Sequence, residues 1–121
     1  MDKYIYLSGP ISDQDYAERF KAFEEKEAMF ERNGFKVFNP MKNGLAPESK
    51  THQHMRRDLS VLTNEETPIS HIFMMDKWTH SAGCWKEFET AVSCGITVIF
   101  EEMSLSKGVK SFGKYCGVKF E

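Results

Sequence analysis

The stretch Pro68-Ile69-Ser70-His71-Ile72-Phe73-Met74-Met75 decides how this chain folds. Behind the chain-turning proline, residues 69–75 form a nearly continuous apolar run. A short run of this kind is typical of a β-strand that is buried on both of its faces. Such strands belong mainly to parallel sheets that carry helices on each side. The stretch therefore predicts an α/β fold.

Outward from this strand, the chain alternates between strand-like and helix-like segments. Between Tyr16 and Phe30, aromatic residues recur at helical spacing. Ser12 precedes them as the expected N-cap, and Asn33-Gly34 follows as a stop signal. We expect strands at residues 4–8, 35–38, 69–75 and 96–100, and helices at residues 13–32, 52–63 and 83–94. This order predicts a parallel sheet with helices on both faces.

The composition is that of an ordinary globular domain, with 121 residues of which 40% are hydrophobic and 28% are charged. We expect a single domain covering residues 1–121. The net charge of −2 argues against binding to polymeric nucleic acid, which usually requires a basic excess. No apolar run approaches the ~18 residues of a transmembrane helix, so we expect no membrane association.

The use of cysteine and histidine indicates a cytoplasmic protein without a metal site. The three cysteines are odd in number and widely spaced, and no signal peptide precedes the first strand. Free thiols in the cytoplasm are the simplest interpretation. His52 and His54 stand two residues apart, which suits zinc on a strand but not on one face of a helix. We therefore expect the histidines to be surface or linker residues.

In a parallel sheet of this kind, ligands bind beyond the carboxyl ends of the strands. The segments that follow the strands are residues 8–12, 39–51 and 76–87. In the first, Ser8 and Gly9 would let a ligand approach the backbone, and a helix starting near Ser12 would offer N–H groups to an anion. The same residues also suit an ordinary turn. Residues 41–51 form a long loop that is either a lid or a surface loop.

Two carboxylates are candidates for chemistry at this edge. Asp58 shares a helical face with Met55 and Leu62, where a carboxylate is costly unless it is paired or solvated in a cleft. Glu87 and Glu89 flank the apolar face of the last helix on opposite sides, and periodicity does not choose between them. Glu87 lies nearer the helix start and the strand ends. A pair of carboxylates suits nucleophilic and acid chemistry at a glycosidic carbon.

The two tryptophans have different expected roles. Trp78 lies in the loop at the ligand edge, where stacking on a base is expected. Trp85 lies in the apolar stripe of the last helix and is expected in the core.

Several short motifs, taken in their order and spacing, resemble the nucleoside 2-deoxyribosyltransferase-like superfamily, which includes 2′-deoxynucleoside 5′-phosphate N-hydrolases. The resemblance is closest to a small bacterial and phage-associated branch and spans residues 4–100. The motifs that carry it are Tyr6-Leu7-Ser8-Gly9-Pro10-Ile11-Ser12, Phe38-Asn39-Pro40, Arg57-Asp58-Leu59, Trp78 with Ser81-Ala82-Gly83, and Glu87 with Ala91.

The resemblance implies a flavodoxin-like, Rossmannoid three-layer sandwich with a parallel sheet of four to five strands. It implies a homodimer or higher homo-oligomer with active sites near the subunit contacts. The implied activity is cleavage of the N-glycosidic bond of a deoxynucleoside or its monophosphate, a small-molecule substrate, without a metal or organic cofactor.

The resemblance also assigns roles to individual residues. Glu87 would be the nucleophile that attacks the anomeric carbon, and Asp58 would hold or protonate the leaving base. Tyr6 would orient the sugar and Glu87. The residues expected to bind the substrate are Ser8, Gly9, Ile11, Asn39, Trp78, Ser81 and Gly83.

The chain departs from the superfamily pattern in ways that bear on the reaction. Many relatives carry an aspartate at the start of the third strand, where this chain has Ser70. The C-terminal asparagine of the transferases has no counterpart, because no asparagine follows Asn64. The partner-subunit serine of the hydrolases has three candidates, Ser104, Ser106 and Ser111. Hydrolysis is therefore the leading expectation, ahead of base exchange and of a non-catalytic module that binds nucleotides or ADP-ribose-type ligands.

Overall fold

The computed structural model of the chain describes residues 3–101. The three candidate serines of the C-terminal tail lie outside these residues. The strands are β1 (Lys3–Ser8), β2 (Phe35–Phe38), β3 (His71–Met74) and β4 (Thr97–Phe100). The helices are α1 (Tyr16–Arg32), α2 (Thr51–Leu62) and α3 (Ala82–Ser93), and two short 3₁₀ turns are η1 (Pro40–Lys42) and η2 (Trp78–His80). The alternation of strands and helices predicted from the sequence is confirmed.

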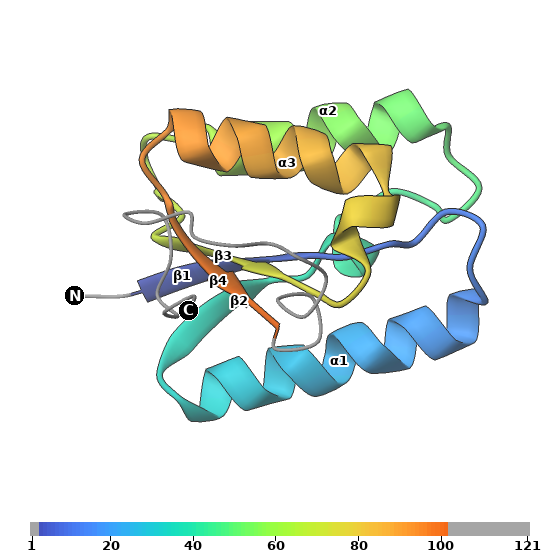
Figure 1. Cartoon of the computed structure of the whole chain (residues 1–121), viewed down its shortest axis with the longest axis horizontal. Helices are drawn as coiled ribbons and strands as arrows, with labels where there is room; N and C mark the ends of the chain where they lie inside the picture. The colour runs from blue at the N-terminus through green and yellow to red at the C-terminus, as the bar shows by residue number, and fades with distance from the viewer. Residues whose placement is uncertain (1–2, 102–121) are drawn as a thin grey trace.

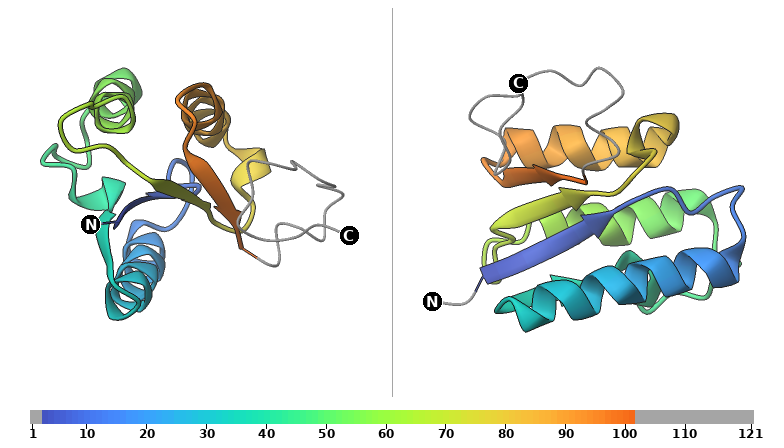
Figure 2. Two further views of the ribbon diagram at one scale, coloured as in Figure 1. Left: turned by 90° about the vertical axis from the view of Figure 1, so that its left-hand side faces the viewer. Right: turned by 60° about the horizontal axis from the view of Figure 1, so that its bottom comes forward.

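The four strands form one parallel sheet in the order β2-β1-β3-β4. Helix α1 covers one face, and α2 and α3 lie side by side on the other (Figures 1 and 2). The protein is thus a three-layer, Rossmann-like α/β sandwich. From β1 the chain moves to one side to form β2 and to the other side to form β3. The switch point, where ligands bind in such sheets, therefore lies at the carboxyl ends of β1 and β3.

Strand β3 is buried on both faces, as its apolar run predicts. Its side chains alternate, so that Ile72 and Met74 join the core on the side of α2 and α3. Phe73 belongs to the core on the side of α1. The strand is shorter than residues 69–75, although backbone hydrogen bonds continue past both ends, from the N–H of Ser70 to the carbonyl of Tyr4 at 2.9 Å and from the N–H of Met75 to the carbonyl of Ser8 at 2.7 Å. The Oγ of Ser70 also donates to the carbonyl of Tyr4 at 2.9 Å and accepts from the N–H of Tyr4 at 3.1 Å.

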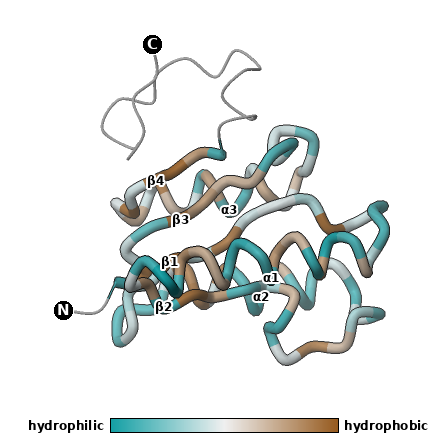
Figure 3. The backbone as a smooth tube through the Cα atoms, turned by 90° about the horizontal axis from the view of Figure 1, so that it is seen from below, coloured by the Kyte–Doolittle hydropathy of each residue, from teal (hydrophilic) through white to brown (hydrophobic). Residues whose placement is uncertain are grey.

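Helix α1 begins at Tyr16, three residues later than expected. The N-cap is Asp15, whose carboxylate accepts from the N–H of Glu18 at 3.0 Å, so the prediction of Ser12 as the cap is wrong. Asp13 has a left-handed backbone with φ of 62°, which is incompatible with a helix at that point. Along the helix, hydrophilic and hydrophobic stretches alternate, as expected for a helix with one face on the sheet (Figure 3). The late start leaves a longer loop at the ligand edge.

The two tryptophans exchange the environments expected of them. Trp78 is completely buried, with ring centroids 4.6 Å from Trp85 and 5.1 Å from Phe88. Trp85 is 39% exposed and donates its indole N–H to the carbonyl of Thr79. The expectation of a core Trp85 is therefore wrong, and a fully buried Trp78 does not have a face free to stack on a base. The reason is that the buried face of α3 includes Glu87 and does not include Trp85.

No helix within residues 3–101 is long and apolar enough to span a membrane.

Exchange of each tryptophan for alanine tests this reassignment. Trp78→Ala removes a fully buried ring and should lower the free energy of unfolding by about 3–5 kcal/mol. Trp85→Ala removes a partly exposed ring and should cost clearly less. Urea denaturation followed by far-UV circular dichroism measures both. Equal losses from the two substitutions would contradict the assignment of Trp78 to the core.

Candidate active site

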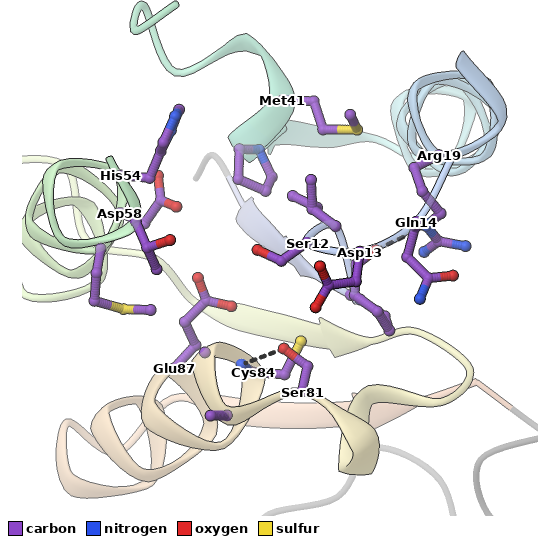
Figure 4. Close-up of a pocket in the computed structure, with 18 of the residues that line it drawn as sticks. Ser12, Asp13, Gln14, Arg19, Met41, His54, Asp58, Ser81, Cys84 and Glu87 are labelled. Atoms are coloured by element: carbon purple, nitrogen blue, oxygen red, sulfur yellow. Dashed lines mark hydrogen bonds between the residues drawn. The ribbon is translucent and has the colours of Figure 1, made fainter. Parts of the chain in front are cut away.

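A cavity of about 860 Å³ opens at the carboxyl edge of the sheet, next to the switch point. Its volume lies within the usual range for small-molecule sites. The lining comes from the loop after β1, the loop after β2, helix α2, and the segment that leads from β3 into α3 (Figure 4). The loops in this lining are the ones that the sequence marks as the ligand edge. Part of α2 and the first turn of α1 also contribute to it.

The carboxylate of Glu87 lies in the floor of this cavity and is only 6% exposed as a residue. Its Oε2 accepts from the hydroxyl of Tyr6 at 2.5 Å, and its Oε1 accepts from the hydroxyl of Ser8 at 2.6 Å. Burial raises the pKa of Glu87 from 4.5 to about 7, even though both hydrogen bonds favour the charged form. Glu87 therefore changes its charge near neutral pH.

Strand periodicity explains why two hydroxyls meet this carboxylate. Tyr6 and Ser8 are two residues apart on β1, so their side chains point to the same face of the sheet. That face is the one covered by α3. Burial raises the pKa of the Tyr6 phenol well above its ordinary value of 10.0, and the carboxylates of Glu87 and Asp58 raise it further. Tyr6 therefore keeps its proton and acts as a hydrogen bond donor.

Asp58 projects into the same cavity from α2, opposite Glu87 on α3 (Figure 4). The expectation that these two carboxylates approach one another across a cleft is confirmed. Asp58 is buried, and burial raises the pKa of its carboxyl group. The side chain of Asn43 and the charges of His54 and Arg57 oppose that rise. Glu89 is exposed, so Glu87 is the glutamate of this helix that faces the cavity.

The two carboxylates also act on each other. The negative charge of Asp58 raises the pKa of Glu87. Two acidic groups in one buried site resist double ionisation. This arrangement places two carboxyl groups of raised pKa within a single cavity.

Four of the remaining predicted residues line the cavity, namely Gly9, Ile11, Ser81 and Gly83. At Gly9, a Cβ atom would lie 3.0 Å from the side chain of Met75, so the close packing of the first loop favours glycine. The hydroxyl of Ser81 caps α3 by accepting from the N–H of Cys84.

The structure places the other predicted residues outside the lining. Tyr6 and Ser8 reach the site only through their hydrogen bonds to Glu87. Trp78 lies in the core, as described above. Asn39 is buried beside the cavity, where its Oδ1 caps η1 by accepting from the N–H of Met41 and its Nδ2 donates to Glu27. The predicted contacts of Trp78 and Asn39 with a substrate are therefore not supported.

Sequence reasoning missed several residues of the cavity. His54 lies one helical turn before Asp58, and this spacing was the available signal. Cys84 likewise lies one turn before Glu87, and burial raises the pKa of its thiol to about 11, so it stays protonated. Arg19 donates its Nε–H to the carbonyl of Pro10 at 2.8 Å and so supports the first loop. No periodic signal in the sequence indicates this contact between residues nine apart.

Among residues 3–101, no three side chains of histidine, cysteine, aspartate or glutamate gather closely enough to hold a metal ion.

The raised pKa of Glu87 predicts a specific dependence of stability on pH. Between about 4.5 and 7 the folded protein retains a proton that the unfolded chain has lost, so the free energy of unfolding falls as pH rises through this window. Glu87→Gln removes the buried charge. At pH 8 the variant should therefore be more stable than the wild type by roughly 1–3 kcal/mol, and this advantage should disappear below about pH 4.5.

Urea denaturation at pH 4.5 and pH 8 measures this difference. Glu89→Gln is the matched control, because Glu89 lies on the same helix and is exposed. A destabilised Glu87→Gln variant at pH 8 would contradict the raised pKa.

No curated protein gives a match to this chain. A family model described as a domain of unknown function, DUF4406, matches residues 3–100. The matched range contains all four strands and both carboxylates of the cavity. The chain therefore belongs to the DUF4406 family.

Proposed function

We propose that this protein hydrolyses the N-glycosidic bond of a 2′-deoxynucleoside 5′-monophosphate. The observation that carries the proposal is the buried Glu87 carboxylate, held by two hydroxyls and facing a second carboxylate across a cavity of small-molecule size. A pair of carboxyl groups is the usual catalytic machinery for cleaving glycosidic bonds. The sequence resemblance to deoxyribosyltransferases and deoxynucleotide hydrolases supports the same chemistry.

In the first step of the proposed reaction, an Oε atom of Glu87 attacks the anomeric carbon of the deoxyribose. A carbon–oxygen bond forms, the bond from carbon to the base nitrogen breaks, and its electron pair leaves with the base. Asp58, in its protonated form, donates a proton to the departing base. Burial raises the pKa of Asp58, and this rise increases the fraction of the carboxyl group that holds the proton needed for this step.

In the second step, water attacks the anomeric carbon of the glycosyl ester. The new carbon–oxygen bond replaces the bond to Glu87, and Asp58 takes up the proton that the water loses. The products are the free base and 2-deoxyribose 5-phosphate, and the enzyme returns to its starting state. A free base in place of water would give base exchange instead.

Tyr6 and Ser8 act as positioning residues in this scheme. Each hydroxyl donates to one oxygen of Glu87, so the carboxylate cannot turn away from the cavity. Such fixed donors lower the reorganisation that the site must undergo during reaction. Both hydrogen bonds also favour the ionised nucleophile.

Three further features belong to the same proposal. The ligand is a small molecule that fits the cavity, and the protein works in the cytoplasm. It acts as a homodimer or higher homo-oligomer, as the resemblance implies. Size-exclusion chromatography with light scattering tests the last point, and a monomeric mass would contradict it.

A direct assay tests the proposed reaction. The purified protein is incubated with a panel of deoxynucleosides and their 5′-monophosphates, and release of free base is followed by chromatography. Glu87→Ala should abolish release, whereas Glu89→Ala should leave it largely intact. An added acceptor base should not increase base release if water is the acceptor. Equal activity of Glu87→Ala and the wild type would contradict the nucleophile, and binding without any release would favour a nucleotide-binding module.

The rate of hydrolysis should depend on pH through Glu87. The nucleophile must be ionised and Asp58 must hold its proton, so kcat/KM should pass through a maximum as pH rises. One limb of this profile should report the titration of Glu87 at a pH of about 7. Tyr6→Phe removes a hydrogen bond to the charged form and should move the limb to higher pH by about one unit. An unchanged limb in this variant would contradict the role of Tyr6.

A further inference from the structure

Asn43 lies in the loop between β2 and α2, and both polar atoms of its side chain are engaged. Its Oδ1 accepts from the N–H of Leu45 at 3.0 Å. Its Nδ2 donates to Oδ1 of Asp58 at 3.0 Å and lies 3.1 Å from Nδ1 of His54. The residue is only 7% exposed and lines the cavity.

These contacts fix the orientation of the amide. The backbone N–H of Leu45 is always a donor, so the atom that faces it must be the amide oxygen. The amide nitrogen therefore faces Asp58, and its two hydrogens point to Asp58 and His54. Because the amide nitrogen of Asn43 can only donate, its contact with Nδ1 of His54 suits the imidazole tautomer that carries its proton on Nε2.

The backbone around Asn43 is anchored to the helix that bears Asp58. Arg57 donates from Nη1 to the carbonyl of Asn43 at 2.8 Å. The next residue, Gly44, has a φ of +89°, and a Cβ atom at that position would lie 3.2 Å from the same nitrogen of Arg57. The loop thus follows a path that brings the amide to Asp58, and the anchor is the residue next to Asp58 in sequence.

We propose that Asn43 is the positioning residue for Asp58, holding one carboxylate oxygen so that the other, Oδ2, meets the leaving base. This inference rests on the proposed function, in which Asp58 protonates the base. Without the amide, the carboxyl group could rotate and turn its proton away from the base. The titratable groups within residues 3–101 whose charges couple to Asp58 are His54 and Arg57 from its own helix, Glu87 from α3 and Tyr6 from β1.

The chain provides a matched control in the same loop. Asn39 is also buried, accepts from the N–H two residues ahead at 2.9 Å, and donates its amide to the carboxylate of Glu27 at 3.1 Å. Asn43→Asp and Asn39→Asp each keep the acceptor for the backbone turn and each replace an amide donor by a carboxylate. Only the first change touches Asp58. Asn43→Leu is a second test variant, because leucine cannot donate in any protonation state.

The experiment compares two substrates that differ in the leaving group. One is a 2′-deoxynucleoside 5′-monophosphate, whose base needs a proton to depart. The other is 2-deoxyribose 5-phosphate with 4-nitrophenol at the anomeric carbon, which departs as an anion without one. Asn43→Asp and Asn43→Leu should lower kcat/KM for the nucleotide by roughly 10- to 100-fold and change it little for the nitrophenyl substrate. Asn39→Asp should leave the ratio of the two rates at its wild-type value.

The outcomes separate this inference from the proposed function. If the wild type cleaves neither substrate, the proposed function is wrong, and this inference fails with it. If the wild type cleaves both, but Asn43→Asp and Asn43→Leu slow them equally or not at all, the positioning role alone is wrong. A second readout does not need activity. In a ¹³C NMR titration, both Asn43 variants should raise the pKa of the Asp58 carboxyl group above its wild-type value, and an unchanged pKa would likewise overturn the inference.

Discussion

The structure depends most on one constraint, which is that the carboxylate of Glu87 is buried within the apolar stripe of α3. An unpaired carboxylate in such a place costs several kcal/mol, so the rest of the domain must supply partners for it. β1 supplies two hydroxyls from one face, at 2.5 and 2.6 Å. These contacts link the central strand to the helix above it, and they set the floor of the cavity. The arrangement lowers stability at neutral pH and leaves a buried carboxyl group whose pKa is about 7.

The architecture could be predicted from the sequence because it rests on local and periodic signals. The apolar run before Met75 and the helical spacing of aromatic residues in α1 report burial directly, and alternation of the two element types fixes a parallel sheet. The start of α1 could not be predicted, because Ser12 and Asp15 are both good caps. The left-handed backbone of Asp13 decides between them, and no residue pattern announces it.

The candidate site was predictable only in part, and the limit again has a physical reason. Helical spacing and the position of strand ends were sufficient to single out Glu87 and Asp58. The partners of these carboxylates belong to distant segments, and Asn43 reaches Asp58 only because a loop without regular structure folds against α2. The exchange of roles between Trp78 and Trp85 has a related origin. A periodic pattern places an apolar residue near the core but does not reveal that a charged residue occupies the centre of the stripe.

The alternation of side chains along β1 has an evolutionary consequence. Tyr6 and Ser8 face α3, while Ile5 and Leu7 face α1. Substitutions in this strand change one side chain at a time, but the insertion or deletion of one residue would turn every side chain to the opposite face. Leu7 would then lie against the carboxylate of Glu87, which would lose both of its donors at once. Descendants of this sequence can therefore vary in the composition of β1. The number of residues within this strand, however, is fixed.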